Sequence, residues 1–196
     1  MLKMDSEALD LIFRNARTHS VWLDKPVDET LLRQVYDLAR MGPTSANMCP
    51  MRVVFVQSKQ AKERLKPALD AGNVAKTMSA PVTAIIGMDV HFYEQLPKLF
   101  PHADAKAWFK DLPESVLEYT ALRNSSLQGA YFILAARSLG LDCGPMSGFN
   151  NAMVDELFFA GSSVKSNFLC NVGHGDASKL HPRSPRLPFE EACQLV

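Results

Sequence analysis

The sequence feature that most constrains the fold is a long helical pattern from Glu114 to Leu139, which contains no proline and only one glycine, Gly129. Proline and glycine are the residues that most weaken a helix interior, so their scarcity predicts one unbroken helix. The second half of this segment is apolar on all sides rather than along one stripe. Such a helix is typically buried on several faces, and we therefore expect it to lie inside the fold.

The remaining pattern predicts shorter helices and a few strands. We expect helices after Asp5 or Ser6, after Asp28, after Ser58 and over 151–159, and short helices within an aromatic-rich excursion at 91–113. The first two should bury Leu9, Ile12, Phe13 and Ala16, and Leu31, Leu32, Val35, Leu38 and Ala39, respectively. Apolar runs predict strands at about 52–57, 82–87 and 167–172. Segments 71–76 and 143–149 are expected to be a break and a tight turn.

Because helices dominate and the strands are separated by helical crossovers, the predicted class is α+β. We expect a single domain over residues 1–196, with a small central sheet surrounded by helices. The length is sufficient for one sizeable core.

Composition narrows the classes of partner. Lys and Arg together number 21, as do Asp and Glu, so the net charge is zero and favours neither nucleic acid nor an anionic membrane. No apolar run approaches the ~20 residues of a membrane span. The N-terminus lacks the apolar core of a signal peptide. The 4 cysteines are widely spaced and the 5 histidines form no ligand motif, so we expect reduced thiols, a cytoplasmic protein and no metal site.

A polar loop joins the second predicted helix to the first strand, over residues 41–50. Gly42 and Pro43 end the helix, because proline cannot extend the hydrogen-bond ladder. The small polar side chains that follow are Thr44, Ser45 and Asn47. They offer donors and acceptors with little bulk, and suit contact with the edge of a planar polar ring. The alternative is an ordinary polar turn, since these are common turn residues.

Two further segments carry cationic donors. Residues Arg17-Thr18-His19-Ser20 place a guanidinium, two hydroxyls and an imidazole after the first helix, and phosphate oxygens require such donors. Near the end of the chain, neighbouring prolines restrain Arg183 and Arg186. The alternatives are a solvated loop and a flexible basic tail.

Cys49 invites comparison with a nucleophile, but the sequence does not identify the base or cation that a thiolate needs. A structural or cofactor-lining cysteine is the alternative. No G-x-G-x-x-G fingerprint is present, so an enzyme of this sequence that uses NAD(P)H would take its hydride through another carrier.

Taken together, these segments resemble the nitroreductase family of FMN-dependent oxidoreductases, over nearly the whole chain and in the family's order. The matching segments are Arg17-Thr18-His19-Ser20, the loop from Pro43 to Pro50, Asn73 with Lys76, Pro145-Met146-Ser147-Gly148-Phe149, and Arg186-Leu187-Pro188. The resemblance implies an interlocked homodimer with two FMN sites at the subunit interface, and NADH or NADPH as co-substrate.

The resemblance also implies roles for individual residues. The flavin phosphate is expected against Arg17, His19, Ser20, Arg183 and Arg186. The ring edge is expected against the loop that holds Pro43, Thr44, Ser45 and Asn47, with Asn73 and Lys76 at the pyrimidine side or the ribityl chain. The turn at Pro145, Met146, Ser147 and Gly148 is expected to approach N5 through its backbone.

Within the family, the chain is most similar to the malonic semialdehyde reductases of pyrimidine degradation. The similar segments are 16–19, 42–47, 92–97, 123–128 and 144–149. Cys49, Met51 and Ser147 stand where many other members carry Gln, Trp and Glu. This similarity implies a small carboxylated aldehyde as acceptor, with Arg123 or Lys76 as its cationic partner. A reductase of quinones, nitro groups or enones, and a non-catalytic helical dimer, remain as alternatives.

Overall fold

The computed structural model describes residues 3–196. Its centre is a four-stranded sheet in the order β1-β2-β4-β3, in which every neighbouring pair is antiparallel. The strands are β1 (Met51–Val56), β2 (Val82–Asp89), β3 (Asp142–Met146) and β4 (Val164–Gly173). The two edges of the sheet are therefore β1 and β3, which lie on opposite sides of the central pair.

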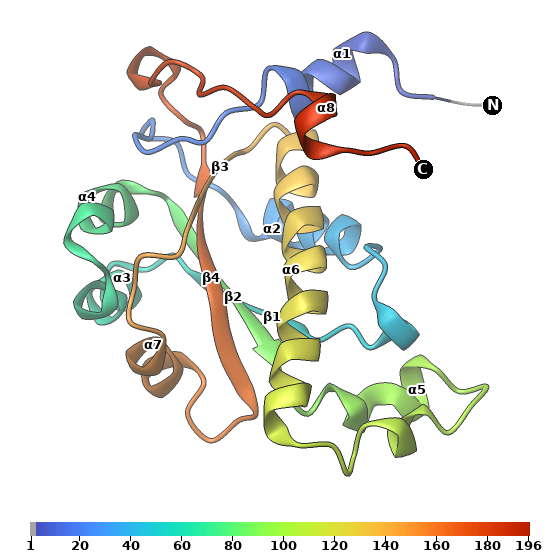
Figure 1. The fold of residues 1–196 in the computed structure, drawn as a ribbon. Coiled ribbons are helices and arrows are strands. Elements are labelled where there is room, and N and C mark those ends of the chain that lie inside the picture. The colour runs from blue at the N-terminus through green and yellow to red at the C-terminus, as the bar shows by residue number, and fades with distance from the viewer. Residues whose placement is uncertain (1–2) are drawn as a thin grey trace.

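Helices cover both faces of the sheet (Figure 1). On one face lie α2 (Glu29–Ala39) and α6 (Glu114–Ser138); on the other lie α3 (Lys59–Leu65), α4 (Ala71–Ser79) and α7 (Asn151–Phe158). Side chains alternate along β2 as a strand requires. Ala84 and Ile86 pack into the core with α2 and α6, whereas Ile85 packs into the second core with α3 and α7. The three-layer α+β arrangement confirms the predicted fold class.

Helix α6 confirms the predicted long helix, and it ends before Gly140, which adopts a left-handed φ of 77° suited to glycine. Its inner side buries Phe132 and Ala136 against the sheet. Its outer side remains apolar and exposed, with Val116, Tyr119, Leu122, Leu127 and Tyr131. The apolar all-round pattern therefore reflects an inner face packed within the chain and an outer face that a single chain leaves uncovered.

The excursion between β2 and α6 forms short helices, as expected, including α5 (Leu96–Leu99). A third core joins it to the first half of α6 and to the loop before β1. This core contains Met48, Phe92, Leu96 and Leu117. The excursion therefore supports the polar loop from below in Figure 1.

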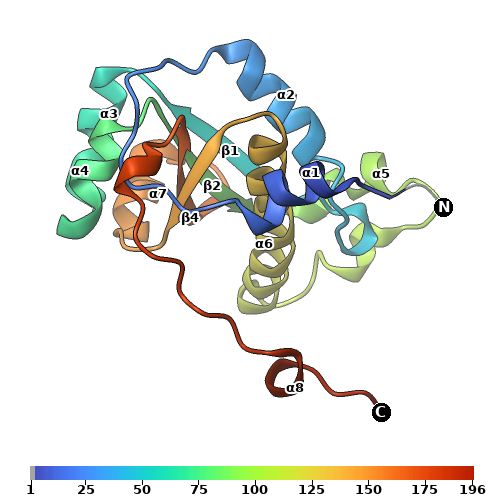
Figure 2. The ribbon, with the colours of Figure 1, turned by 90° about the horizontal axis from the view of Figure 1, so that it is seen from above.

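The segments that flank the sheet in sequence are the N-terminal helical segment and the C-terminal tail. The N-terminal segment forms α1 (Ser6–Leu9) and a π-helical turn over Asp10–Arg14. After β4 the chain forms a 3-10 turn over Ala177–Lys179 and continues as a tail that carries α8 (Phe189–Ala192), in which every residue from 181 to 196 is exposed. Figure 2 shows this tail leaving the body of the protein as an extended arm.

Several local expectations were wrong. Residues 71–76 belong to α4: Gly72 and Asn73 fall in its first turn, where helix-weakening residues cost little. Residues 142–146 form β3, an edge strand that tolerates Pro145 because its outer side carries only an isolated bridge, at Cys143.

Two apolar side chains expected in helix interfaces are also exposed. Phe13 is 52% exposed and Leu38 is 47% exposed. The apolar faces of the first two helices are therefore wider than the surfaces that this chain packs against them. Among residues 3–196, no helix has the length and apolar character needed to cross a membrane.

Candidate functional site

Most of the predicted cationic and turn residues meet at one end of the sheet. We use the name basic cluster for Arg17, His19, Ser20, Asn73, Lys76, Pro145–Gly148 and Arg183. The segment around His19 joins β3, because its backbone N–H donates to the carbonyl of Cys143 at 3.1 Å. Trp22 then reaches α4, since its Nε1 donates to the carbonyl of Lys76 at 3.1 Å. These contacts gather segments that are far apart in the sequence.

The turn after β3 is held tightly against α4. The carbonyl of Gly148 accepts Nδ2 of Asn73 at 2.6 Å and the backbone N–H of Asp70 at 3.1 Å. A Cβ at position 148 would lie only 2.5 Å from that Nδ2 atom, so this close approach requires glycine. Met146 is buried, whereas Pro145 and Ser147 are exposed. The turn therefore presents backbone and small groups beside Asn73.

The arginines near the two ends of the chain interlock. Arg17 donates to the carbonyl of His181. In return, Arg183 donates to the carbonyls of Arg14 and Ala16 at 2.8 and 2.9 Å. A guanidinium has five N–H groups, so both arginines retain donors for an anion. Arg186 contacts only carbonyls of its own tail segment, Ser184 and Pro185, and the structure does not bring it into the cluster.

His19 is the predicted phosphate donor that the structure buries, at 6% exposure. Its Nε2 lies 3.4 Å from Oδ1 of Asp142, and its Nδ1 is buried without a hydrogen-bond partner within residues 3–196. Asp142 also accepts the backbone N–H of Gly175 at 2.9 Å. The pKa of His174 is lowered by burial and then by Lys25, while Asp142 acts in the opposite direction. Asp142, which the sequence analysis missed, thus faces two histidines.

The polar loop before β1 has an unusual backbone. Ala46, Asn47 and Cys49 have φ values of 47°, 49° and 42°, in the left-handed region that residues with a Cβ rarely adopt. Strain of this kind persists only where the surroundings impose it. Here Asn124 on α6 accepts the backbone N–H of Ser45 at 2.8 Å. Nδ2 of Asn47 donates to the carbonyl of Leu99 at 2.8 Å.

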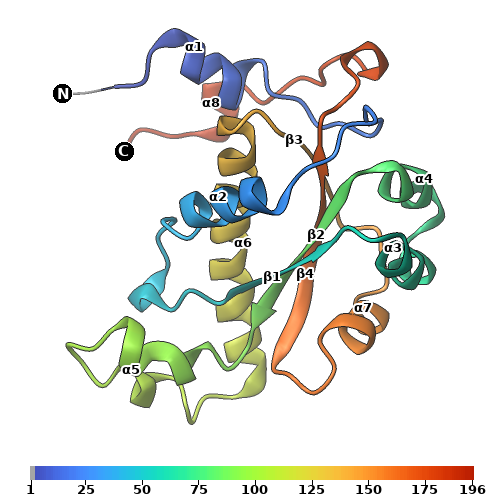
Figure 3. The same cartoon turned by 180° about the vertical axis from the view of Figure 1, so that it is seen from behind.

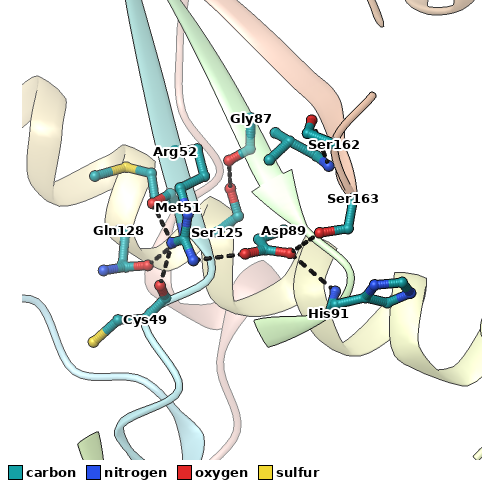
Figure 4. A network of polar contacts seen from close by, with 11 residues as sticks. Cys49, Met51, Arg52, Gly87, Asp89, His91, Ser125, Gln128, Ser162 and Ser163 are labelled. Carbon is teal, nitrogen blue, oxygen red and sulfur yellow. Dashed lines mark hydrogen bonds and ion pairs between the residues drawn. The ribbon is translucent and has the colours of Figure 1, made fainter. Parts of the chain in front are cut away.

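The end of the loop is fixed by a second set of polar contacts (Figure 4). Oε1 of Gln128, also on α6, accepts the backbone N–H of Met51 at 2.9 Å. Arg52 donates to the carbonyls of Cys49 and Met51, both at 3.0 Å, and pairs with Asp89 at 2.6 Å. The loop is therefore clamped at both ends before any ligand binds.

The sequence analysis missed Asn124 and Gln128 as clamps of this loop. Both are buried in the middle of α6, at 1% and 3% exposure. The sequence did show two amide side chains one helical turn apart in a largely apolar helix. Such amides, if buried, need hydrogen-bond partners, and this could have pointed to a clamp. The thiol of Cys49 contacts Asn47 and Thr44, neither of which is a base, while the nearby cation of Arg52 binds the carbonyl of Cys49.

The basic cluster and the polar loop do not meet within one chain. No hydrogen bond among residues 3–196 joins them, and Figures 1 and 3 place the loop beside α5, on the far side of α6 and the sheet from α4. The two substrate candidates are divided in the same way. Lys76 belongs to the cluster, whereas Arg123 lies on α6 next to Asn124, with its guanidinium 4.5 Å from the ring centroid of Tyr119.

A groove of about 1440 Å³ runs along the free edge of β1, between that strand, α2 and α5. Its lining includes Asn47 and Cys49 of the loop, together with Tyr36, Arg52 and Leu99. The polar loop therefore borders an open groove as well as the exposed face of α6.

Comparison with known proteins identifies the family. The sequence model of the nitroreductase family matches residues 14–174, so the chain belongs to this family. A protein from Stenotrophomonas maltophilia, provisionally named NADH dehydrogenase/NAD(P)H nitroreductase, is 62% identical, and the match covers 98% of both chains. A protein of the same provisional name from Burkholderia lata is 59% identical over the full length of both chains.

Solved structures show the same fold. A provisionally named nitroreductase from Bacillus subtilis, ydfN, superposes with a TM-score of 0.88 at 22% identity, and covers 97% of this chain and 99% of its own. A provisionally named nitroreductase from Exiguobacterium sibiricum, solved in complex with FMN, has a TM-score of 0.86 at 19% identity and covers 100% of both chains.

Proposed function

We propose that the chain is an FMN-dependent oxidoreductase that uses NAD(P)H, and that each site is assembled from two chains. The observation that carries the proposal is the presence of two preformed half-sites, the basic cluster and the clamped polar loop, on opposite sides of one chain. The FMN complex of the Exiguobacterium sibiricum protein and the names of the relatives support the choice of cofactor and co-substrate.

The side chains of the basic cluster fit FMN. Arg17 and Arg183 keep free guanidinium donors for a phosphate, and charged hydrogen bonds of this kind are the strong ones. Asn73 and Lys76, on adjacent turns of α4, offer an amide and an ammonium to the pyrimidine side or the ribityl chain. Pro145 and Ser147 are exposed and Gly148 is half-buried, so the turn would leave room for a planar ring to approach its backbone near N5. Ser20 and His19 complete the phosphate side, whereas Arg186, which contacts only its own tail within one chain, would join a phosphate site only through the arm of a dimer.

The polar loop supplies the complementary half. Pro43, Thr44, Ser45 and Asn47 are exposed or half-buried, and the clamps on α6 hold their backbone before binding. A preorganised loop loses little conformational entropy when it meets the ring edge. The chemistry that FMN supplies when bound is transfer of a hydride from NAD(P)H to an acceptor, while the protein orients both and excludes water.

The same geometry supports an interlocked homodimer. The outer face of α6 exposes Val116, Tyr119, Leu122, Leu127 and Tyr131, an apolar surface of the kind that marks interfaces. The exposed tail projects from the body, and the free edge of β1 beside the groove offers unpaired backbone groups to a partner. We expect an obligate interface that buries more than ~2,000 Å².

For the acceptor, we propose a small carboxylated aldehyde, with malonic semialdehyde as the first choice. Its carboxylate needs a cation, and Arg123 is well suited because the ring of Tyr119 and its hydroxyl, 2.5 Å away, hold the guanidinium in place. Lys76 is the second choice. A quinone or nitro compound is the competing acceptor, and the names of relatives 59–62% identical to this chain favour it.

The cofactor is tested by adding FMN to the purified protein, washing it, and denaturing it to measure the released flavin. About one FMN per chain is expected, because each dimer has two sites. Release of no flavin after reconstitution would reject the proposal, and release of FAD or a metal in its place would redefine the cofactor.

The acceptor is tested by steady-state rates with malonic semialdehyde, menadione and nitrofurazone. Arg123→Ala should raise KM for the acid about ten-fold or more and leave KM for an uncharged aldehyde nearly unchanged, because only the ionic contact is lost. If malonic semialdehyde reacts no faster than menadione or nitrofurazone, the carboxylated-aldehyde assignment fails and a general quinone or nitro reductase remains.

A further inference from the structure

Lys62 on α3 is a lysine buried to 4% exposure. Its Nζ donates to the carbonyl of Thr77 at 2.8 Å and to Oγ1 of Thr83 at 2.5 Å. Neither partner is an anion, and no carboxylate pairs with this ammonium among residues 3–196. Burial lowers the pKa of Lys62 to about 8. A buried cation without a counter-ion is costly and needs an explanation in the surrounding structure.

The explanation lies at the end of α4. The last carbonyls of a helix have no partner within the helix and carry its partial negative charge. Pro81 follows closely and lacks the N–H that could cap them. Lys62 donates to the carbonyl of Thr77. The carbonyl of Lys76 accepts Nε1 of Trp22 at 3.1 Å and Nδ2 of Asn171 at 3.2 Å. Side chains from α3, β4 and the N-terminal segment thus replace the missing backbone cap.

These contacts form one connected chain. Thr83 accepts from Lys62 and donates to Oδ1 of Asn171 at 2.7 Å. Asn171 then donates to the carbonyl of Lys76. The ammonium of Lys62 is therefore linked, through two side chains on neighbouring strands, to the backbone of a residue in the basic cluster.

We propose that Lys62 is a positioning residue of the cofactor site, which caps α4 from inside the protein and so holds Asn73 and Lys76 where the flavin needs them. The inference rests on the proposed FMN site, because it concerns the helix that presents two of the residues assigned to that site. It adds a residue that touches neither flavin nor substrate.

Few charged groups face Lys62. On α4 the charged side chain is Lys76. The charged residues of β2 and β4, Asp89 and Lys165, lie at the far end of the sheet and pair with Arg52, Glu114 and Glu118. On α7 they are Asp155 and Glu156, and on α3 itself Lys59, Glu63 and Arg64. Among residues 3–196, none of these carboxylates pairs with Lys62, and burial lowers its pKa.

The first test compares FMN affinity at pH 7, by quenching of flavin fluorescence, in the wild type, Lys62→Met and Lys66→Met. Lys62→Met keeps the apolar stem and should raise the FMN dissociation constant about ten-fold. Lys66→Met removes an exposed lysine that pairs with Glu63 nearby, and should leave it unchanged. Thr83→Val keeps the charge of Lys62 but breaks the link to Asn171, and should also weaken binding. Wild-type affinity in both Lys62→Met and Thr83→Val would overturn the proposal.

The second test separates positioning from a general loss of stability. The wild-type FMN affinity should fall several-fold as pH rises through about 8, where Lys62 loses its proton, and this step should be absent in Lys62→Met. Identical pH profiles would contradict the proposal.

The third test does not depend on FMN. Amide hydrogen exchange of the flavin-free protein should accelerate in residues 71–79 of Lys62→Met and stay unchanged in α6. Unchanged exchange in α4 would reject the internal cap. A wild type that binds no flavin would instead reject the cofactor site while leaving this exchange result interpretable.

Discussion

The basic cluster and the polar loop reach their geometries by different routes. The cluster draws residues from the N-terminal segment, α4, the end of β3 and the tail, and a set of long-range contacts holds these together. The loop is a single segment, residues 41–50, in which Ala46, Asn47 and Cys49 have a strained backbone, and two amides of α6 hold its backbone at Ser45 and Met51. The geometry of the cluster therefore requires that all the segments at this end of the sheet are folded, whereas the geometry of the loop requires mainly that α6 is in place.

The comparison also shows what one chain lacks. The polar loop lies beside α5, whereas α4 of the basic cluster lies on the other side of the sheet (Figure 3). A ligand with a phosphate at one end and a planar ring at the other is expected to contact both. The division of the site between chains would then make dimer formation a condition for cofactor binding.

The largest expected effect comes from separating the two chains. Leu127→Glu places a carboxylate on the outer apolar face of α6, and burying an unpaired charge in an interface is costly. We expect a monomer by sedimentation at low micromolar concentration, with the loss of nearly all bound FMN. Lys59→Glu, on the opposite side of the sheet, is the matched control and should remain dimeric. A folded, monomeric Leu127→Glu variant that still binds FMN tightly would contradict the division of each site between two chains.

The next effect concerns the phosphate side of the basic cluster. Arg17→Ala and Arg183→Ala should each weaken FMN binding about ten- to a hundred-fold, since a charged hydrogen bond contributes about 1.5–3 kcal/mol. Arg33→Ala, which removes an exposed arginine paired with Glu29, is the control. Measurement is by fluorescence titration together with thermal unfolding. Unchanged affinity in both cluster variants would show that these arginines only join the chain ends.

Arg186→Ala sharpens the same point. Its guanidinium contacts only its own tail within one chain, so a weakening equal to that of Arg17→Ala would mean that the arm delivers Arg186 to a site in the dimer. Wild-type affinity in Arg186→Ala would mean that Arg186 does not bind the flavin phosphate.

A smaller effect is expected at the loop clamp. Asn124→Leu preserves the approximate volume but leaves the backbone N–H of Ser45 without its acceptor. We expect a loss of stability of about 1–3 kcal/mol and a several-fold fall in kcat/KM, because the strained loop is no longer imposed. Ser126→Ala, an exposed neighbour on α6, should change neither. Normal kinetics in Asn124→Leu would show that the left-handed backbone of the loop does not matter for turnover.

The smallest effect is a pH dependence of stability. The pKa of Lys62 is lowered to about 8 in the folded state from the usual 10.5, so between these values the unfolded chain binds more protons. The contribution of Lys62 to stability therefore rises with pH across this window. The free energy of unfolding of the wild type, relative to Lys62→Met, should increase between about pH 8 and 10.5 in denaturant titrations. A constant difference would show that Lys62 titrates normally.

The sequence predicted the elements whose local signals agree with their packing. Helix α6 has no breaker in its first turns, and β2 is buried on both faces, so propensity and environment point the same way. In α4 and β3, propensity and environment disagree. Gly72 is tolerated because it lies in the first turn of its helix, and Pro145 is tolerated because β3 is an edge strand. That residues 1–196 form one domain, and that the protein is cytoplasmic, stay predictions.

For the site, the sequence predicted residues that bear obvious donors and missed those that act through other residues. Asn124, Gln128, Asp142 and Lys62 make contacts that only the tertiary structure brings together. Their polar character was visible in the sequence, but their partners lie far away in it, and no local pattern identifies them.

The division of each site between two chains is tested most directly by subunit complementation. One chain carries Arg17→Ala with Arg183→Ala, and the other carries Thr44→Ala with Asn47→Ala; neither homodimer should bind FMN tightly. If each site joins the basic cluster of one chain to the loop of its partner, a purified heterodimer combines both defects in one site and leaves the other intact. We predict one FMN per heterodimer with wild-type affinity, and half the wild-type rate. A heterodimer with no site of wild-type affinity would contradict the account.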